Sequence, residues 1–330
     1  MTLDLQVKND CISFGDEFSV RFQRTLRIPD DGKTYPLPPG LGAFQIRRVD
    51  DYRDRVPSDW LEHGGVFLPM FQREAMWISF GSLMPHAVKV GIGKVCAITG
   101  KPWSETLVDE PQNYLVAPPQ PWLDGICVKK GRIRQFVAMP LGMGYTVEGQ
   151  VTGEERFGGI QIKVFAPKPG KLQRMRARCA APPPPMACAA PAGYGSVRRS
   201  GAMGLGAGGY MTQKIYPDPH GIETWDPTET ARVFVHIVNS ELWREITGEA
   251  APSTPVTAKE YAKHGFPWFD LYDEHVSALD PTGVFNQVKS IKSIDEEKST
   301  LPLQDDSSVE PSVVKKLYLA AKHLVRDGNW

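Results

Sequence analysis

Short segments in which apolar and polar residues alternate recur along the chain and predict β-strands. Along residues 17–28, Val20 and Phe22 fall on one face of an extended chain, and Arg24 interrupts that face. Residues 75–80 are short and apolar, so their period does not decide between a strand and a helix. Further strands are expected at residues 44–49, 66–71, 87–93, 95–99, 114–117, 126–128, 132–139, 159–165, 210–216 and 232–238.

Turn-forming residues separate these segments, and no helical pattern interrupts their succession up to residue 166. The chain holds 31 glycines and 29 prolines, which favour turns over long helices. Gly131, between two of the expected strands, supplies the positive φ of a tight hairpin. We therefore predict a mainly β protein: an antiparallel sandwich or barrel core with a few short helices, a long Pro/Ala/Gly-rich loop and a C-terminal amphipathic helix.

The core is expected in two parts, residues 1–166 and 210–287, because the composition changes between them. Residues 167–209 contain a Pro/Ala-rich run followed by a glycine-rich run, which is typical of a flexible loop. Gly204–Gly209 matches the G-x-G-x-x-G pattern of dinucleotide sites. That pattern requires a strand before it and a helix after it, whereas a Pro/Ala-rich stretch precedes this one and a strand-like segment follows. We therefore interpret the glycine run as a flexible hinge.

Helices are predicted in the last third of the chain. Residues 240–246 form one that Gly248 ends, and Thr257, with Glu260 three positions later, has the spacing of a capping box. Beyond the core, the chain is expected to end in a tether and a helix.

Residues 288–311 are polar and acidic-leaning, as a tether would be, and residues 312–330 carry apolar positions at helical spacing. Such a helix is expected to fold back onto its own domain, to dock in a partner's groove or to lie on a membrane surface. Its expected docking positions are Val313, Leu317, Ala321 and Leu324.

Charge and composition exclude several classes of protein. The 38 basic residues are balanced by 38 acidic ones, whereas a general nucleic-acid binder needs a cationic surplus. No window approaches 18 consecutive apolar residues, so no membrane-spanning helix is expected. The N-terminus has no basic leader followed by an apolar stretch, so no secretory signal is expected either. The five widely spaced cysteines predict free thiols, and we expect a cytoplasmic protein without a cofactor.

Four phrases of the sequence carry a resemblance to a known family. They are RQFVAMPLG at 134–142, YTVE at 145–148, IYPDPHG at 215–221 and PWFD at 267–270. With these phrases the chain resembles an uncharacterised family of bacterial and fungal proteins, some of which are labelled hypothetical or integral membrane proteins. The resemblance covers most of residues 20–275 and implies no activity or catalytic residue. The sequence holds no spanning segment that would match the membrane label.

A group of carboxylate and imidazole side chains between prolines is the first candidate site. Asp218, His220 and Asp226, with Glu223 between them, are of types that hold a divalent ion if the loop curls. The alternative is a turn in which Asp218 and Asp226 accept hydrogen bonds from the local backbone. No standard metal-ligand spacing such as H-x-x-x-H is present, so both interpretations stay open.

Three Pro-Trp pairs with acidic residues nearby form the second candidate site. Trp103, Trp122 and Trp268, together with Asp124 and Asp270, offer faces that stack on a sugar and carboxylates that hydrolyse a glycosidic bond. The alternative is that these tryptophans fill the ends of the β core, where strands enter turns.

Since no catalytic motif has its required context, our leading functional hypothesis is a non-enzymatic one. We expect a cytoplasmic binding protein or a self-assembling structural protein, whose partner is itself or another protein. The first alternative is a carbohydrate-active or metal-dependent hydrolase, which requires the candidate residues to converge in one pocket. The second alternative is a peripheral membrane protein that uses the C-terminal helix.

Overall fold

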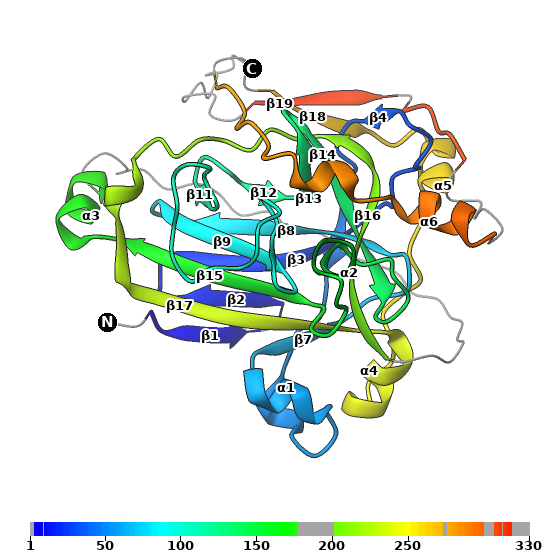
Figure 1. Ribbon diagram of the computed structural model, residues 1–330, viewed down its shortest axis with the longest axis horizontal. Coiled ribbons are helices and arrows are strands. Elements are labelled where there is room, and N and C mark those ends of the chain that lie inside the picture. The colour runs from blue at the N-terminus through cyan, green and yellow to red at the C-terminus, as the bar shows by residue number, and fades with distance from the viewer. Residues whose placement is uncertain are drawn as a thin grey trace, which may run out of the picture.

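The computed structural model describes residues 3–8, 10–176, 201–272, 276–299, 307–311 and 313–318 of the chain. Within these ranges the protein is mainly β, with one large and mostly antiparallel sheet and short helices at its periphery (Figure 1). The predicted class of fold is therefore confirmed.

Most strands belong to the large sheet. Their bounds are β1 (Leu5–Lys8), β2 (Cys11–Phe14), β3 (Phe18–Thr25), β4 (Thr34–Tyr35), β5 (Gly40–Ala43), β6 (Arg47–Arg48), β7 (Val66–Pro69), β8 (Ala75–Ser82), β9 (His86–Ile92), β10 (Val95–Cys96), β11 (Leu115–Ala117), β12 (Trp122–Leu123), β13 (Gly125–Lys129), β14 (Arg132–Pro140), β15 (Ile160–Pro167), β16 (Ala202–Thr212) and β17 (Trp225–Val238). A separate parallel pair consists of β18 (Trp268–Tyr272) and β19 (Val314–Tyr318).

The described helices are all short. Their bounds are α1 (Ser58–His63), α2 (Val147–Thr152), α3 (Pro169–Arg176), α4 (Ser240–Thr247), α5 (Ala258–Lys263) and α6 (Ile291–Glu297), with 3-10 turns at Val49–Tyr52, Ile222–Thr224 and Val284–Gln287. The predicted signals at two of them are confirmed. Gly248 ends α4 with a φ of 74°, and the Thr257 hydroxyl accepts a hydrogen bond from the Glu260 backbone N–H at the start of α5.

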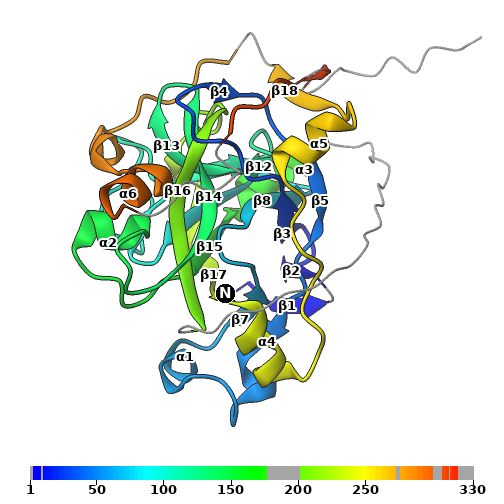
Figure 2. The same cartoon turned by 90° about the vertical axis from the view of Figure 1, so that its right-hand side faces the viewer.

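Seven strands form the continuous antiparallel body of the sheet, in the order β3, β8, β14, β16, β17, β15, β9. At one end β2 continues the sheet from β3, and at the other β10 and β11 pair with β9. The parallel pairings in the large sheet are those of β4 with β16 and of β7 with β17. Figure 2 shows how this body curves, with β14 and β16 on one side and β2 and β3 on the other.

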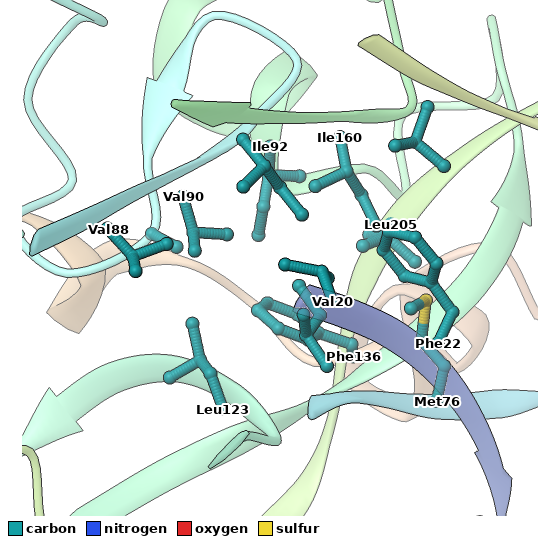
Figure 3. Packing of buried hydrophobic residues seen from close by; sticks show 14 of the residues in the cluster. Val20, Phe22, Met76, Val88, Val90, Ile92, Leu123, Phe136, Ile160 and Leu205 are labelled. Carbon is teal, nitrogen blue, oxygen red and sulfur yellow. The ribbon is translucent and has the colours of Figure 1, made fainter. Parts of the chain in front are cut away.

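The curvature brings the apolar faces of distant strands into one buried core. Val20 and Phe22 of β3, the two positions expected from the alternation, lie in the same cluster as Val90 of β9 and Leu205 of β16 (Figure 3). Because side chains alternate along a strand, the residues between these core positions point to the opposite, outer face of the sheet.

The prediction of a flexible hinge at Gly204–Gly209 is wrong, because this run lies inside β16. Its glycines admit neighbouring chain segments that leave no room for a side chain. A Cβ atom on Gly208 would lie 2.7 Å from Val137 Cγ2, and one on Gly209 would lie 2.4 Å from the Pro29 carbonyl oxygen. Within the predicted loop 167–209, residues 169–176 form α3 and residues 202–209 belong to β16. Residues 177–200 lie outside the described ranges.

The prediction of a tether at residues 288–311 is also wrong over its first half, where α6 forms. Ile291 and Ile294 lie on one face of this helix and are buried against the sheet. The Arg73 guanidinium donates two hydrogen bonds of 2.7 Å to the Asp295 carboxylate of the same helix. The polar composition of this segment therefore did not indicate that Ile291 and Ile294, three positions apart, form the buried face of a helix.

The predicted amphipathic helix at residues 312–330 is contradicted where the chain is described, because Val314–Tyr318 form the strand β19. This strand pairs with β18 in parallel, with Trp268 opposite Val314. The Val313 carbonyl accepts a hydrogen bond from the Trp268 backbone N–H. Ladder hydrogen bonds satisfy the backbone here in place of helical ones. Residues 319–330 lie outside the described part of the chain.

Candidate functional site

The outer face of β9, β15 and β17 carries charged side chains in register. Lys89 of β9 lies directly opposite Lys163 of β15, and Lys163 lies opposite Arg232 of β17. Two residues further along, the same three strands place Gly91, Gln161 and Phe234 in a row. The alternation that sends valines and isoleucines into the core thus gathers three cations on the other face.

The segment 101–109 crosses this row of cations, and Glu105 attaches it there. The Glu105 carboxylate accepts hydrogen bonds from Trp103 Nε1 at 2.9 Å and from Lys163 Nζ at 3.0 Å, and it also forms an ion pair with Arg232. Partial burial alone would raise the pKa of this carboxyl group. The hydrogen bonds from Trp103 and Lys163 and the charge of Arg232 outweigh burial, so the pKa lies below its usual value.

Trp103 packs closely over β9 because the position beneath its ring is a glycine. A Cβ atom on Gly91 would lie 2.6 Å from the Trp103 ring, so any side chain there would displace the indole. The Trp103 backbone N–H donates to the Lys94 carbonyl, which fixes the start of the segment. The indole therefore has a defined place on the outer face.

A cavity of about 580 Å³ opens beside Trp103, between α1, the loop 156–159 and the outer face of β15 and β17. We call it the outer-face cavity. Trp60, Trp103, Phe157 and Phe234 give it aromatic walls, and Gln161 lies on its floor. Its volume falls within the roughly 300–1,000 Å³ typical of small-molecule sites.

Two cations at one wall of the outer-face cavity share an aromatic ring. Lys94 Nζ lies 3.8 Å from the centroid of the Phe157 ring, and the Arg156 guanidinium carbon lies 5.3 Å from it. Among the described residues, no carboxylate lies within ion-pair distance of either cation, and Glu148, whose carboxylate accepts from the Lys94 backbone N–H, interacts with the Lys94 charge from farther away. The acidic side chains that line the cavity, Asp59 and Glu62, are exposed residues of α1.

His236 forms a neutral part of the cavity wall. Its ring stacks on Trp60 with centroids 4.4 Å apart, and its Nε2 lies 3.0 Å from the Gly64 carbonyl oxygen. Burial lowers the pKa of this imidazole to about 4. At neutral pH the ring is therefore uncharged and donates from Nε2 to Gly64.

Lys89 lies behind Trp103 and is completely buried, with 0 % of its surface exposed. Its Nζ donates to the Ser104 hydroxyl at 2.9 Å and to the Thr106 carbonyl oxygen, and it lies 5.2 Å from the centroid of the Trp103 ring. Burial, the largest influence, lowers the pKa of this amine to about 8. Lys89 was not among the residues predicted from the sequence, although a lysine within the apolar segment 87–93 was the available signal.

Two of the residues proposed as metal ligands, Asp218 and Asp226, accept structural hydrogen bonds. The Asp218 carboxylate accepts hydrogen bonds from the Tyr114 hydroxyl at 2.7 Å and from Trp225 Nε1 at 2.8 Å. Asp226 accepts bonds from the backbone and hydroxyl of Thr228, as in the alternative turn interpretation. Across the described ranges, no group of three His, Cys, Asp or Glu side chains is placed to hold a metal ion.

The proposed tryptophan–carboxylate set is distributed over separate places. Trp103 lines the outer-face cavity, whereas Trp268 is fully buried in a second apolar cluster, against which Trp122 packs. Asp124 lies near Trp122, is buried, and accepts a hydrogen bond from Gln213 Nε2 at 2.6 Å. Asp270 lies on β18, opposite Lys316 of β19. For Trp122 and Trp268 the arrangement matches the alternative in which tryptophans fill the core.

Of the four expected docking positions, Val313 is described with an exposed side chain. Leu317 lies in β19, and Ala321 and Leu324 lie outside the described residues. The partner that these positions would contact stays a prediction.

No protein family, curated protein or solved structure was found to match this chain. In the described ranges, no helix has the length and apolar character needed to cross a membrane.

Proposed function

We propose that the protein binds a small organic anion with a flat, apolar body in the outer-face cavity. The observation that carries this proposal is the combination, within one cavity of about 580 Å³, of aromatic walls and two cations that have no ion-pair partner among the described residues. It refines the expectation of a non-enzymatic binding protein.

The aromatic side chains support a flat ligand. Trp103 and Phe234 are both half-buried and line the cavity, so each leaves part of its ring for contact. Trp60 is held from behind by its stack on His236. Aromatic rings of this kind gain about 0.5–1.5 kcal/mol per pair beyond area burial when they stack with another ring.

The charges at Phe157 support an anionic group on that ligand. Lys94 and Arg156 both lie near the Phe157 ring, so two positive charges belong to this wall of the cavity. A carboxylate bound at this wall would form charge-assisted hydrogen bonds with them. Arg232, the third cation in the lining, is already paired with Glu105 and is not needed for this role.

The other functional hypotheses have less support. The hydrolase hypothesis required the tryptophans and carboxylates to converge, and Trp103 lies apart from Trp122 and Trp268. Self-association stays a prediction, which light scattering on the chain before and after deletion of residues 309–330 would test. An unchanged monomer in both samples would contradict it.

Isothermal titration calorimetry with 1-naphthoate and its neutral match, 1-naphthamide, tests the proposed function. We expect the carboxylate to bind about 10-fold more tightly than the amide, a difference of about 1.4 kcal/mol. Lys94→Met and Arg156→Met should each weaken binding of naphthoate by about 10-fold. Neither variant should change the affinity for naphthamide.

Lys101→Met is the matched control, because Lys101 is an exposed lysine close to Trp103 that does not line the cavity. It should leave both affinities unchanged. Equal binding of the two ligands would contradict the anionic part of the proposal. No binding of either ligand, or binding that Phe234→Ala does not weaken, would contradict the use of this cavity.

A further inference from the structure

We infer that Lys89 is a carbonyl-reactive amine: a small aldehyde or ketone that passes Trp103 from the outer-face cavity forms an imine with Lys89 Nζ. This site lies behind the cavity wall and is not among the residues that line the cavity. The inference therefore goes beyond the proposed function and does not depend on the anion that the cavity binds.

The burial of Lys89 is the first observation in its favour. Lysine is almost never fully buried unless a carboxylate pairs with it. Arg24, another buried cation, follows that rule, because its Nε donates to the Glu74 carboxylate at 2.6 Å. For Lys89 the described residues supply a hydroxyl, a carbonyl oxygen and an aromatic ring, and no ion pair.

The second observation is that desolvation outweighs the neighbouring charges. Cys96 and Glu105 face Lys89 from β10 and from the segment 101–109, and their charges favour its ammonium form. Lys163, directly across the ladder, disfavours that form but has a smaller influence than either of them. Burial is larger than all three, and desolvation is a condition that activates lysine as a nucleophile in proteins.

A carbonyl compound in the outer-face cavity can reach Lys89 only past the side chain of Trp103. Trp103 contacts Lys89 on one side and lines the outer-face cavity on the other. The indole covers Gly91, which has no side chain to fill the space that the ring occupies. Rotation of the indole away from Gly91 would therefore connect the cavity with the amine.

The reaction requires no reagent besides the carbonyl compound. The lone pair of the neutral amine adds to the carbonyl carbon, the carbonyl oxygen takes up a proton, and a carbinolamine forms. Loss of water, made from that hydroxyl group and a proton of the nitrogen, leaves the C=N bond of the imine. Ser104 accepts a hydrogen bond from Nζ at 2.9 Å and is positioned to orient the amine before addition.

Reductive trapping tests the inference on the full chain. The protein is incubated with glyoxylate and cyanoborohydride, which converts an imine into a stable carboxymethyl-lysine, and each lysine is followed by peptide mass spectrometry. At pH 7.5 we expect Lys89 to be labelled about 10-fold faster than the exposed Lys101, because more of its amine is neutral. The rate at Lys89 should level off above pH 8.

Two variants and one internal control sharpen the result. Trp103→Ala should increase the labelling rate of Lys89 at least 10-fold, with far-UV circular dichroism confirming that the variant is folded. Lys89→Arg should remove the fast-labelled site, because a guanidinium does not form the imine. Lys163 is the internal control, since it lies on the adjacent strand but is paired with Glu105, and it should be labelled slowly.

Labelling that follows surface exposure, with Lys89 unmodified, would overturn the inference. Labelling of Lys89 in Trp103→Ala but not in the wild-type protein would also contradict it, because the native indole would then exclude the carbonyl compound. Either result leaves the binding of naphthoate unaffected, so this inference and the proposed function can fail separately.

Discussion

The two faces of β9, β15 and β17 are made by the same three strands and have opposite characters. On the inner face, Val90, Ile162 and Val233 are paired in register and belong to the large apolar core. On the outer face, one residue further along, Lys89 and Lys163 lie opposite each other under the segment 101–109. One face is therefore filled by packing, and the other is polar although a chain segment covers it.

The two faces place different requirements on their side chains. An inner position needs only an apolar side chain of suitable volume. A lysine that is fully buried on the outer face costs desolvation energy that packing alone would avoid. We therefore interpret the outer face as a surface that binds ligands and holds a reactive amine.

The largest expected effect comes from the inner face. Ile162→Ala should lower the free energy of unfolding by about 2–5 kcal/mol, because it removes buried methyl groups and leaves a cavity. Urea unfolding followed by circular dichroism measures it, and Ile162→Val is the matched control with an expected cost of about 0.5–1.5 kcal/mol. Equal costs for the two variants would contradict close packing on this face.

Asp124 is a buried carboxyl group that belongs to neither face of these three strands, and its titration is expected to affect the stability of the fold. Burial raises the pKa of Asp124 to about 7, against the hydrogen bonds from Trp122 and Gln213. Between about pH 4 and pH 7 the native state keeps a proton that the unfolded state has lost. The free energy of unfolding should therefore fall as pH rises through this range, by an amount on the order of 2–4 kcal/mol.

Asp124→Asn should make that fall smaller, because the amide does not titrate while its oxygen still accepts from Gln213. Glu74, whose pKa burial also raises to about 7, contributes a fall of its own in both proteins. Thermal unfolding between pH 4 and pH 7.5 checks this, with Asp270→Asn as the control at a half-buried aspartate. The interpretation would not survive if wild type and Asp124→Asn showed the same pH dependence.

The smallest expected effect separates a reactive lysine from a structural one. Lys89→Met should change the free energy of unfolding by less than about 1 kcal/mol, because an apolar side chain of similar volume often replaces a buried charge at no cost. Arg24→Met is the comparison variant. It leaves Glu74 buried without its cation and should cost about 3–5 kcal/mol. If Lys89→Met proved as costly as Arg24→Met, Lys89 would be a structural anchor for the segment 101–109.

The strands and caps could be predicted from the sequence because their signals are local. The alternation of Val20 and Phe22 and the spacing from Thr257 to Glu260 both appear where they were expected. The glycines of β16 were misinterpreted, since what they accommodate is the approach of Val137 and Pro29 from distant parts of the chain.

The candidate site could not be predicted, because it also depends on contacts between residues far apart in the sequence. Lys89, Lys163 and Arg232 become neighbours only when β9, β15 and β17 pair, and periodicity does not reveal which strands pair. Trp103 was predicted as a candidate ligand-binding residue together with Trp122 and Trp268, which lie elsewhere in the structure. Its actual neighbour, Gly91, carries no chemical signal in the sequence.

The most direct test of the central claim is the position of a bound anion. A crystal structure of the protein with 1-naphthoate should place the naphthalene ring against Trp103 and Phe234, with its carboxylate at the cavity wall formed by Lys94, Arg156 and Phe157. A naphthoate bound elsewhere, with the outer-face cavity filled only by water, would contradict the account.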